Sequence, residues 1–193
     1  MTDAGDEYLA GELKLSECKI LDIDTGGVGE RYCIDLTCLI SRGEGMLIGS
    51  SASSLALVHG EVIESEFVPA RPFRVNAGSP HSYILMADGK TKYLSELLSG
   101  DEIMLISESG NTRPATIGRL KIETRPFLRI TWQNDYQISN SIYLQQAETV
   151  RVLAGSGEAI SVTKLKTGDS ILCHNSNHTR HIGNKVAITS KEV

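Results

Sequence analysis

One phrase, Leu-x-x-Gly-Asp-x-Ile, occurs twice in the chain and limits the folds that the chain can adopt. It spans residues 97–103 in the first copy and 165–171 in the second, and short apolar runs around a turn precede each copy. We interpret each copy as a small β-unit that contains a hairpin, a tight bend before Gly-Asp and a second hairpin. The period of about 65–68 residues exceeds that of ordinary solenoid repeats. The sequence therefore predicts an internal duplication at 80–122 and 147–189.

The residues of this phrase indicate a structural role. A leucine at its start can fill the interior of the unit, and the glycine can adopt the positive φ that a sharp corner needs. Asp101 and Asp169 follow the two corner glycines. Aspartate at such a position commonly accepts hydrogen bonds from the backbone of its own turn. We therefore expect both aspartates to fix turns, with a catalytic role as the alternative.

The rest of the chain also alternates apolar and polar residues, which is typical of strands. Two alternating segments, 12–23 and 31–40, are separated by a predicted turn at 24–27. Shorter strands are expected at 46–48, 55–58, 120–122, 128–132 and 142–144. No long amphipathic helix is apparent, so the fold class is predicted to be mainly all-β. Small β-barrel or sandwich units with few short helices would fit this pattern.

Length and composition describe a folded chain. With 193 residues, 40% of them hydrophobic, it can form a sizeable core. We divide it into a flexible lead-in at 1–11, a β-domain at 12–80 and the duplicated units at 81–193. The net charge of −5, scattered basic residues and 5% aromatics argue against binding of nucleic acid. The four cysteines are expected to be reduced.

The predicted location is the cytoplasm. No apolar run approaches the length that a membrane span requires, so no membrane association is expected. The first residues are acidic and lack the features of a secretory signal or a transit peptide. A plastid is the alternative if the source is eukaryotic.

The segment 42–77 departs from the plain β pattern and is the candidate site. It is rich in small residues at Gly43, Gly45, Gly49, Ser50 and Ser51. Backbone N–H groups and hydroxyls in such a loop can surround an anion without steric cost. The spacing matches neither a dinucleotide fingerprint nor a Walker loop. A serine-rich β-turn is the alternative interpretation.

Two pairs of polar residues follow in the same segment. His59 and Glu61 are two residues apart on a predicted strand, so their side chains would share one face. This suits a histidine base oriented by a carboxylate, or two metal ligands. Arg71 and Arg74 flank Phe73 in a proline-stiffened segment, which suits recognition of a carboxylate or phosphate. A solvated strand face and ordinary surface charge are the alternatives.

Several ordered phrases resemble the archaeal-type, or class II, 3-dehydroquinate synthase family. In the candidate segment they are GEGMLIGSS, LALVH with the following Glu61, and ARPFRVNAG. Later in the chain they are KTKYLSELLSGDEIMLI, GRLKIETRP, LQQAETVR and LKTGD. The resemblance extends from Glu12 to the C-terminus.

This resemblance implies an enzyme, an NAD-dependent oxidoreductase that acts on a CH–NH2 group. Its implied substrate is 2-amino-3,7-dideoxy-D-threo-hept-6-ulosonate, which is oxidatively deaminated and cyclised to 3-dehydroquinate. That product leads to shikimate and the aromatic amino acids. A similar sister group makes 3-amino-4-hydroxybenzoate with a divalent metal such as manganese, and this is an alternative.

The resemblance also suggests roles for individual residues. His59 with Glu61 is the first choice of catalytic base, and His81 is the second. Binding of substrate or cofactor is expected from Gly43, Glu44, Gly45, Gly49, Ser50, Ser51, Arg71, Arg74, Asn76, Arg180 and His181. Three carboxylates are the candidates for a metal site: Glu44, Glu61 and Glu148.

The chain differs from the resembled family in length and at two phrases. Family members are nearly twice as long, and their N-terminal half contains a lysine suited to a Schiff-base step. The family's Gln-Asn-Ala-Glu reads Gln145-Gln146-Ala147-Glu148 here, and its Arg-His-Phe-Gly reads Arg180-His181-Ile182-Gly183. A separate subunit with the N-terminal half is therefore an implied partner beside the small-molecule substrate. A non-catalytic β-domain is the alternative function, and unpaired edges of short strands would favour self-association into a homo-oligomer.

Overall fold

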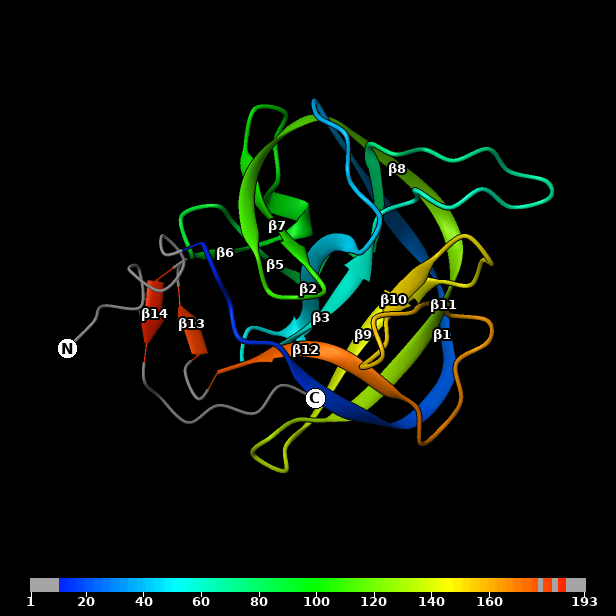
Figure 1. The fold of residues 1–193 in the computed structure, drawn as a ribbon, viewed down its shortest axis with the longest axis vertical. Helices are drawn as coiled ribbons and strands as arrows, with labels where there is room; N and C mark the ends of the chain where they lie inside the picture. Colours follow the sequence, from blue (N-terminus) through cyan, green and yellow to red (C-terminus); the bar gives the residue numbers. More distant parts are fainter. Residues whose placement is uncertain (1–10, 177–178, 182–183, 187–193) are drawn as a thin grey trace.

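The computed structural model describes residues 11–176, 179–181 and 184–186, and almost all of its regular structure is strand (Figure 1). The predicted all-β fold class is therefore confirmed. Among the described residues there is no helix with the length and apolar character needed to cross a membrane. The elements are β1 (Ser16–Leu36), β2 (Glu44–Ser51), β3 (Ser54–His59), β4 (Arg74–Gly78), β5 (Tyr83–Leu85), β6 (Thr91–Tyr93), the 3-10 helix η1 (Leu94–Glu96), β7 (Glu102–Ser107), β8 (Thr112–Gln133), β9 (Ser139–Gln145), β10 (Arg151–Leu153), β11 (Ala159–Ser161), β12 (Ser170–Asn175), β13 (Thr179–His181) and β14 (Asn184–Val186).

Twelve of these strands form one sheet. Its order is β11-β10-β3-β12-β1-β8-β7-β2-β5-β6, while β4 pairs with β1 and β9 pairs with β8. An additional pairing joins β2 to β3, which are separated along this path. The six strands β3, β12, β1, β8, β7 and β2 therefore form a closed ring. Figure 1 shows β1 and β8 as long curved ribbons around the outside, with β2 and β3 near the centre. Strands β1, β2 and β3 of the predicted β-domain are interspersed in this sheet among strands of the predicted duplicated units.

The central strands are buried on both faces, which explains their continuous apolar runs. In β2, Met46 and Ile48 belong to the larger hydrophobic cluster, whereas Leu47 points to a smaller cluster on the opposite face. Residues of β3 alternate in the same way, with Leu57 in the smaller cluster and Val58 in the larger one. The predicted strands at 46–48 and 55–58 are confirmed.

The predicted turn at 24–27 is wrong. These residues lie inside the single long strand β1, where the pairing register with β8 shifts between Thr25 and Val28. A β-bulge of this kind bends a strand without ending it. Gly26 sits against two rings, since a Cβ there would lie 2.8 Å from the Cβ of Phe127 and 3.0 Å from Cδ1 of Tyr143. Gly26 therefore gives room to an aromatic pair, and the chain does not reverse here.

Two further predicted strands are also merged in the structure. The segments 120–122 and 128–132 are both parts of β8, which pairs with β1 along most of its length. The intervening sequence includes Pro126, which would normally interrupt a strand. It lies opposite Val28, next to the bulge of β1, where the register shifts.

The two corners of the duplicated phrase have matching geometry. Gly100 and Gly168 adopt φ values of +96° and +95°, in the region that favours glycine. Oδ2 of Asp101 accepts a hydrogen bond from the backbone N–H three residues earlier at 3.0 Å, and Oδ2 of Asp169 does the same at 2.9 Å. Both aspartates therefore fix turns, as predicted.

Candidate functional site: a basic cleft and an aromatic cavity

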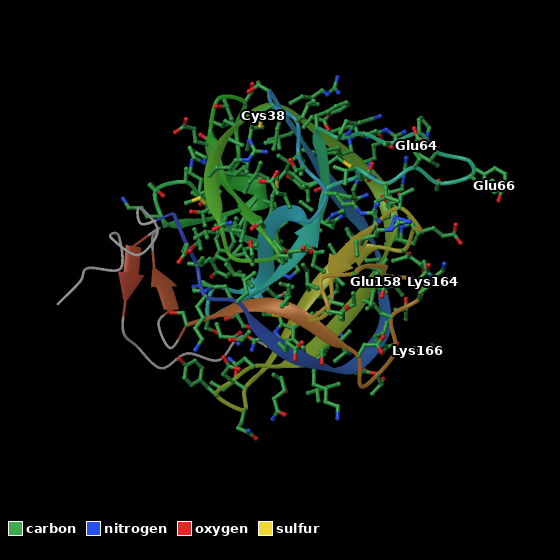
Figure 2. All side chains as sticks on the ribbon, in the orientation of Figure 1. Cys38, Glu64, Glu66, Glu158, Lys164 and Lys166 are labelled. Atoms are coloured by element: carbon green, nitrogen blue, oxygen red, sulfur yellow. The ribbon has the colours of Figure 1, made fainter. Side chains whose placement is uncertain are left out.

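The first part of the candidate site is a cleft of about 450 Å³ under the connection between β3 and β4. This connection projects from the body of the molecule, and Figure 2 labels Glu64 and Glu66 on it. Strands β1, β4, β8 and β9 also contribute to the cleft. We call it the basic cleft; it is lined by Arg31, Cys33, Glu61, Ser65, Phe67, Val68, Arg71, Arg74, Asn76, Lys121, Glu123, Arg125, Gln145, Ala147, Glu148 and Thr149.

Cations outnumber carboxylates in the basic cleft, although the whole chain is acidic. Five lysine or arginine side chains line it against three glutamates. This excess of positive charge in a concave site favours a small anionic ligand. Three sequence-predicted binding residues line it, Arg71, Arg74 and Asn76, together with two predicted metal ligands, Glu61 and Glu148, of which Glu61 is also a predicted catalytic residue.

Glu61 is the candidate acid–base group of the basic cleft. Its residue is 9% exposed, and Nη1 of Arg71 lies 3.5 Å from its Oε2. Burial raises the pKa of the Glu61 carboxyl above its ordinary value, and the nearby Arg74 and Arg71 only partly offset this effect. A carboxyl with a raised pKa can exchange a proton nearer to neutral pH than an exposed glutamate can.

Arg74 is held by a buried partner. Its Nε donates to Oδ1 of Asp35 at 2.7 Å and its Nη2 donates to Oδ2 at 3.0 Å. Burial alone would raise the pKa of the Asp35 carboxyl, but hydrogen bonds from Arg74 and Arg119 keep it below its ordinary value. This bidentate pair fixes the guanidinium at the cleft wall.

Gln145 orients two other cleft residues. Its Oε1 accepts hydrogen bonds from Nδ2 of Asn76 at 2.8 Å and from Nη1 of Arg31. This leaves Oδ1 of Asn76 and Nε of Arg31 buried with no partner. Buried polar atoms are rarely left unpaired in proteins. The cleft therefore presents an acceptor and a donor that a bound ligand can satisfy.

An ion-pair cluster on β8 also lines the basic cleft. Glu123 lies 3.1 Å from Nζ of Lys121 and also contacts the guanidinium of Arg125. These cations hold the pKa of the Glu123 carboxyl below its ordinary value, the hydrogen bond from Lys121 being the largest contribution. Cys33 is buried at the same cleft, and burial raises the pKa of its thiol to about 11. The thiol therefore stays protonated at neutral pH and is a poor nucleophile.

The structure does not bring His59 into the basic cleft. Strand β3 ends at His59, so the shared face expected for a strand does not extend to Glu61. The imidazole is buried, and the backbone N–H of Gly43 donates to its Nε2 at 2.9 Å. Burial, with help from Arg151 and Arg42, lowers the pKa of His59 to about 4. The ring is therefore neutral at physiological pH and accepts a structural hydrogen bond.

The predicted glycine loop lies in the β2–β3 hairpin. A Cβ on Gly45 would lie 1.9 Å from the carbonyl oxygen of Val58, and one on Gly49 would lie 2.8 Å from that of Ser54. These two glycines thus allow the two strands to approach closely. Gly43 lines a separate hollow of about 510 Å³ outside the basic cleft.

The three carboxylates predicted for a metal are not assembled. Nε and Nη2 of Arg113 donate to the two carboxylate oxygens of Glu44, each at 2.8 Å, and this lowers the pKa of the Glu44 carboxyl. Glu61 and Glu148 both line the basic cleft, and Glu44 does not. Within the described part of the chain, no group of three or more His, Cys, Asp or Glu side chains is placed to hold a metal ion.

The second part of the candidate site is a larger hollow of about 680 Å³, which we call the aromatic cavity. It contains three other predicted residues: Ser50, Ser51 and His81. Sequence reasoning did not connect these residues with the strands β8 and β9 that complete the wall. The full lining is Ser50, Ser51, His81, Tyr83, Tyr93, Arg129, Thr131, Ser139, Asn140, Ser141 and Tyr143.

The basic cleft and the aromatic cavity lie in succession along β9. Tyr143 lines the cavity and Gln145 lines the cleft, and residues two apart on a strand point to the same face. On the neighbouring strand β8, Arg129 lines the cavity and Arg125 the cleft. Phe127 lies between them and packs edge-on against Tyr143, with ring centroids 6.4 Å apart. We call Phe127 and Tyr143 the aromatic partition.

Two predicted binding residues lie beyond the described side chains. Arg180 and His181 belong to β13, which pairs with β14, and only their backbone is described. By contrast, several cleft residues were not predicted, notably Arg31, Lys121 and Arg125. The alternation of Lys121, Glu123 and Arg125 was a usable signal, because it places three charges on one strand face.

Together, these features define a class: an all-β domain with a basic cleft, whose excess of positive charge favours a small anionic ligand. Comparison with known proteins specifies it further. The family model for the 3-dehydroquinate synthase II C-terminal domain matches residues 17–192, and the chain belongs to this family.

Three archaeal relatives, each named 3-dehydroquinate synthase, are similar over most of the chain. The protein of Methanocaldococcus jannaschii is 46% identical over 172 residues, which cover 89% of this chain and 47% of the relative. That of Nitrosopumilus maritimus is 45% identical over 174 residues, covering 90% and 49%. That of Methanosphaera stadtmanae is 44% identical over 170 residues, covering 88% and 47%. The chain thus spans about half the length of these relatives.

Proposed function

We propose that this chain supplies the substrate-binding part of a class II 3-dehydroquinate synthase. The proposed reaction is the NAD-dependent oxidative deamination of 2-amino-3,7-dideoxy-D-threo-hept-6-ulosonate and its cyclisation to 3-dehydroquinate, toward shikimate and the aromatic amino acids. The observation that carries the proposal is the basic cleft, whose cations suit a carboxylate substrate, in a chain of this family.

The chemistry has two balanced stages. In the first, the C2–H bond of the substrate breaks, its electron pair leaves as hydride to NAD⁺, and the resulting imine takes up water. Ammonium is released and a 2-keto acid remains, with one proton given up. In the second, a proton leaves the C7 methyl group beside the C6 ketone, and C7 forms a bond to C2, whose oxygen takes up a proton. The second stage is a rearrangement that needs no further oxidant.

The residues of the basic cleft suit the non-redox parts of this sequence. Arg71 and Arg125 can bind the C1 carboxylate, which planar guanidinium groups recognise well. The unpaired Oδ1 of Asn76 can accept a hydrogen bond from the substrate ammonium or from a hydroxyl. Glu61 can take the proton that either stage releases, because its raised pKa brings it closer to that of the reacting groups.

The proposed NAD cofactor serves as the hydride acceptor when bound. The described residues form strands and one 3-10 helix, so within this chain NAD would be held by the strands and loops of an all-β domain. A metal is not part of the proposal, because Arg113 already occupies both oxygens of Glu44 and the three predicted carboxylates do not share one site. His81 stays a second candidate base on the aromatic cavity side of the partition.

The test is an assay of the purified 193-residue chain with the amino-ulosonate and NAD⁺. NADH is followed by absorbance and 3-dehydroquinate by mass spectrometry, with the chain alone and with the N-terminal half of the Methanocaldococcus jannaschii relative added. Product from the chain alone establishes a complete enzyme. If product forms in the mixture but not with the chain alone, the chain is a catalytic subunit. The absence of product from both, together with no binding of the amino-ulosonate, overturns the proposed function and favours a binding domain of another kind.

Two matched variants show whether the basic cleft is the site. Arg71→Gln should raise KM for the amino-ulosonate about tenfold or more, since a hydrogen bond to a charged group contributes about 1.5–3 kcal/mol. Lys164→Gln removes the same charge from an exposed position outside the cleft lining and should leave KM unchanged (Figure 2). An equal change in both variants would place binding elsewhere.

A further inference from the structure

The aromatic cavity has a lining unlike that of the basic cleft. It contains no carboxylate, and Arg129 is the one described lining residue with a permanent charge. Nη2 of Arg129 lies 3.8 Å from Asp24, while its Nε is buried without a partner. An arginine with a buried unpaired donor at a cavity wall favours an anionic group on the ligand.

Aromatic side chains form two walls of this cavity. The rings of Tyr83 and Tyr93 lie 4.7 Å apart at an angle of 37°, and their hydroxyls are 3.1 Å apart. His81 meets Tyr143 edge-on, with ring centroids 5.2 Å apart. Aromatic faces of this kind can stack on a planar heterocycle with little regard to its identity.

Hydroxyl groups complete the cavity and are already organised around His81. Nε2 of His81 lies 3.2 Å from Oγ of Ser50, and its Nδ1 lies 3.0 Å from Oγ of Ser79. Ser79 is buried and also contacts Ser82, so the imidazole is fixed from the protein side. The serines on β9, Ser139 and Ser141, face the same space. Such hydroxyls suit the sugar of a ligand as both donors and acceptors.

We propose that the aromatic cavity binds a nucleotide, with its planar ring on the tyrosine walls, its sugar near the serines and its phosphate at Arg129. The volume of about 680 Å³ lies in the usual range of small-molecule sites. Since the cavity and the basic cleft flank the aromatic partition, a bound nicotinamide nucleotide would lie beside the cleft that we propose for the substrate. This last step rests on the proposed function, whereas nucleotide binding itself does not.

The experiment is calorimetric titration of the full 193-residue chain with NAD⁺, AMP, adenosine and inorganic phosphate. AMP and NAD⁺ should bind saturably and at least tenfold more tightly than adenosine or phosphate. In Arg129→Gln the affinity for AMP should fall to that for adenosine, whose binding should change little. Tyr93→Ala, at a residue 40% exposed, should weaken AMP and adenosine alike. Lys164→Gln is the charge-matched control and should bind as the wild type does.

Several results would overturn this inference. All lining residues belong to this chain, so failure of NAD⁺ and AMP to bind at millimolar concentration rejects it. If phosphate binds as tightly as AMP, the planar ring is not recognised by the cavity. If AMP binding is unchanged in Arg129→Gln, the phosphate does not lie at Arg129. Arg129→Lys keeps the charge and serves as the second variant if Arg129→Gln does not fold. Binding of the amino-ulosonate is measured separately, so the proposed function can stand if nucleotide binding fails.

Discussion

At the scale of single residues, the buried His59 predicts a specific dependence of stability on pH. Its pKa is lowered from 6.5 to about 4, so the folded chain binds the proton less readily than the unfolded chain does. Stability should therefore fall as pH decreases from about 6.5 to about 4. The control is His59→Gln, in which the amide oxygen can replace Nε2 as acceptor from Gly43. Relative to this variant, the free energy of unfolding of the wild type should fall by roughly 3 kcal/mol over this pH window. Urea unfolding of both proteins at pH 7 and pH 4.5 measures most of this loss. The same difference in stability between them at both pH values would contradict the prediction.

Glu61 leads to a prediction about turnover instead. Its pKa is raised because it is buried, so a base at this position becomes active only as pH rises above the ordinary range of glutamate. We expect kcat/KM of the active enzyme to increase with pH through this raised pKa, and Glu61→Gln to lower it by about 10²–10⁴-fold and to remove the increase. His59→Gln, which alters the neighbouring buried residue outside the cleft, should retain turnover. A Glu61→Gln enzyme with the unchanged pH profile would exclude Glu61 as the base.

At the scale of elements, the bulge of β1 determines whether the aromatic partition can form. Gly26→Ala should destabilise the chain by about 1–3 kcal/mol, because the added methyl overlaps Phe127 and Tyr143. The matched control is Gly27→Ala, at φ +73° with nothing within 4 Å of the new Cβ, which should cost only about 1 kcal/mol of backbone strain. Denaturant unfolding compares the two. An effect of Gly27→Ala as large as that of Gly26→Ala would show that the close approach to the rings is unimportant.

This bulge also shows why the sequence predicted some elements and not others. The consecutive glycines at 26–27 predict a turn from local chemistry alone, because the rings that Gly26 accommodates are 100 residues or more away in the chain. The corners at Gly100 and Gly168 were predictable since the aspartate and its backbone partner lie within one turn. Glu61 and Asn76 were found from their motif, whereas Arg31 joined the site only through the pairing of β1 with β8.

The duplicated corners permit a paired test at the same scale. Asp169→Ala removes an acceptor that one backbone N–H uses, and should cost about 1 kcal/mol. Asp101→Ala should cost somewhat more, because Oδ2 of Asp101 also lies 3.1 Å from Nζ of Lys92. Asparagine at either position keeps an acceptor and should recover most of the stability. Denaturant midpoints rank the four variants, and recovery by asparagine at neither corner would contradict the turn-fixing role.

At the scale of the whole molecule, a buried polar network joins the two segments that the sequence divides. Nε1 of Trp132 donates to Oγ of Ser54 at 2.9 Å, and that hydroxyl donates to Oδ1 of Asn175 at 2.6 Å. Nδ2 of Asn175 lies 3.3 Å from Sγ of Cys18. The network thus connects β8, β3, β12 and β1, and each of these strands pairs with at least one of the others. Separate folding of a β-domain at 12–80 would leave these groups buried without partners or exposed to water.

We therefore expect residues 12–80 and 81–193 to unfold together in one cooperative transition. Trp132 is the single tryptophan and is fully buried, so its fluorescence reports the core, while far-UV circular dichroism reports all the strands. The two signals should give the same midpoint in urea. Ser54→Ala leaves the indole N–H unpaired, which should lower stability by about 1–3 kcal/mol and move both midpoints equally. Two separated transitions, or a shift of the fluorescence midpoint alone, would mean that the segments fold independently. A basic cleft assembled from β1, β4, β8 and β9 requires the single transition, because neither segment contains all of its walls.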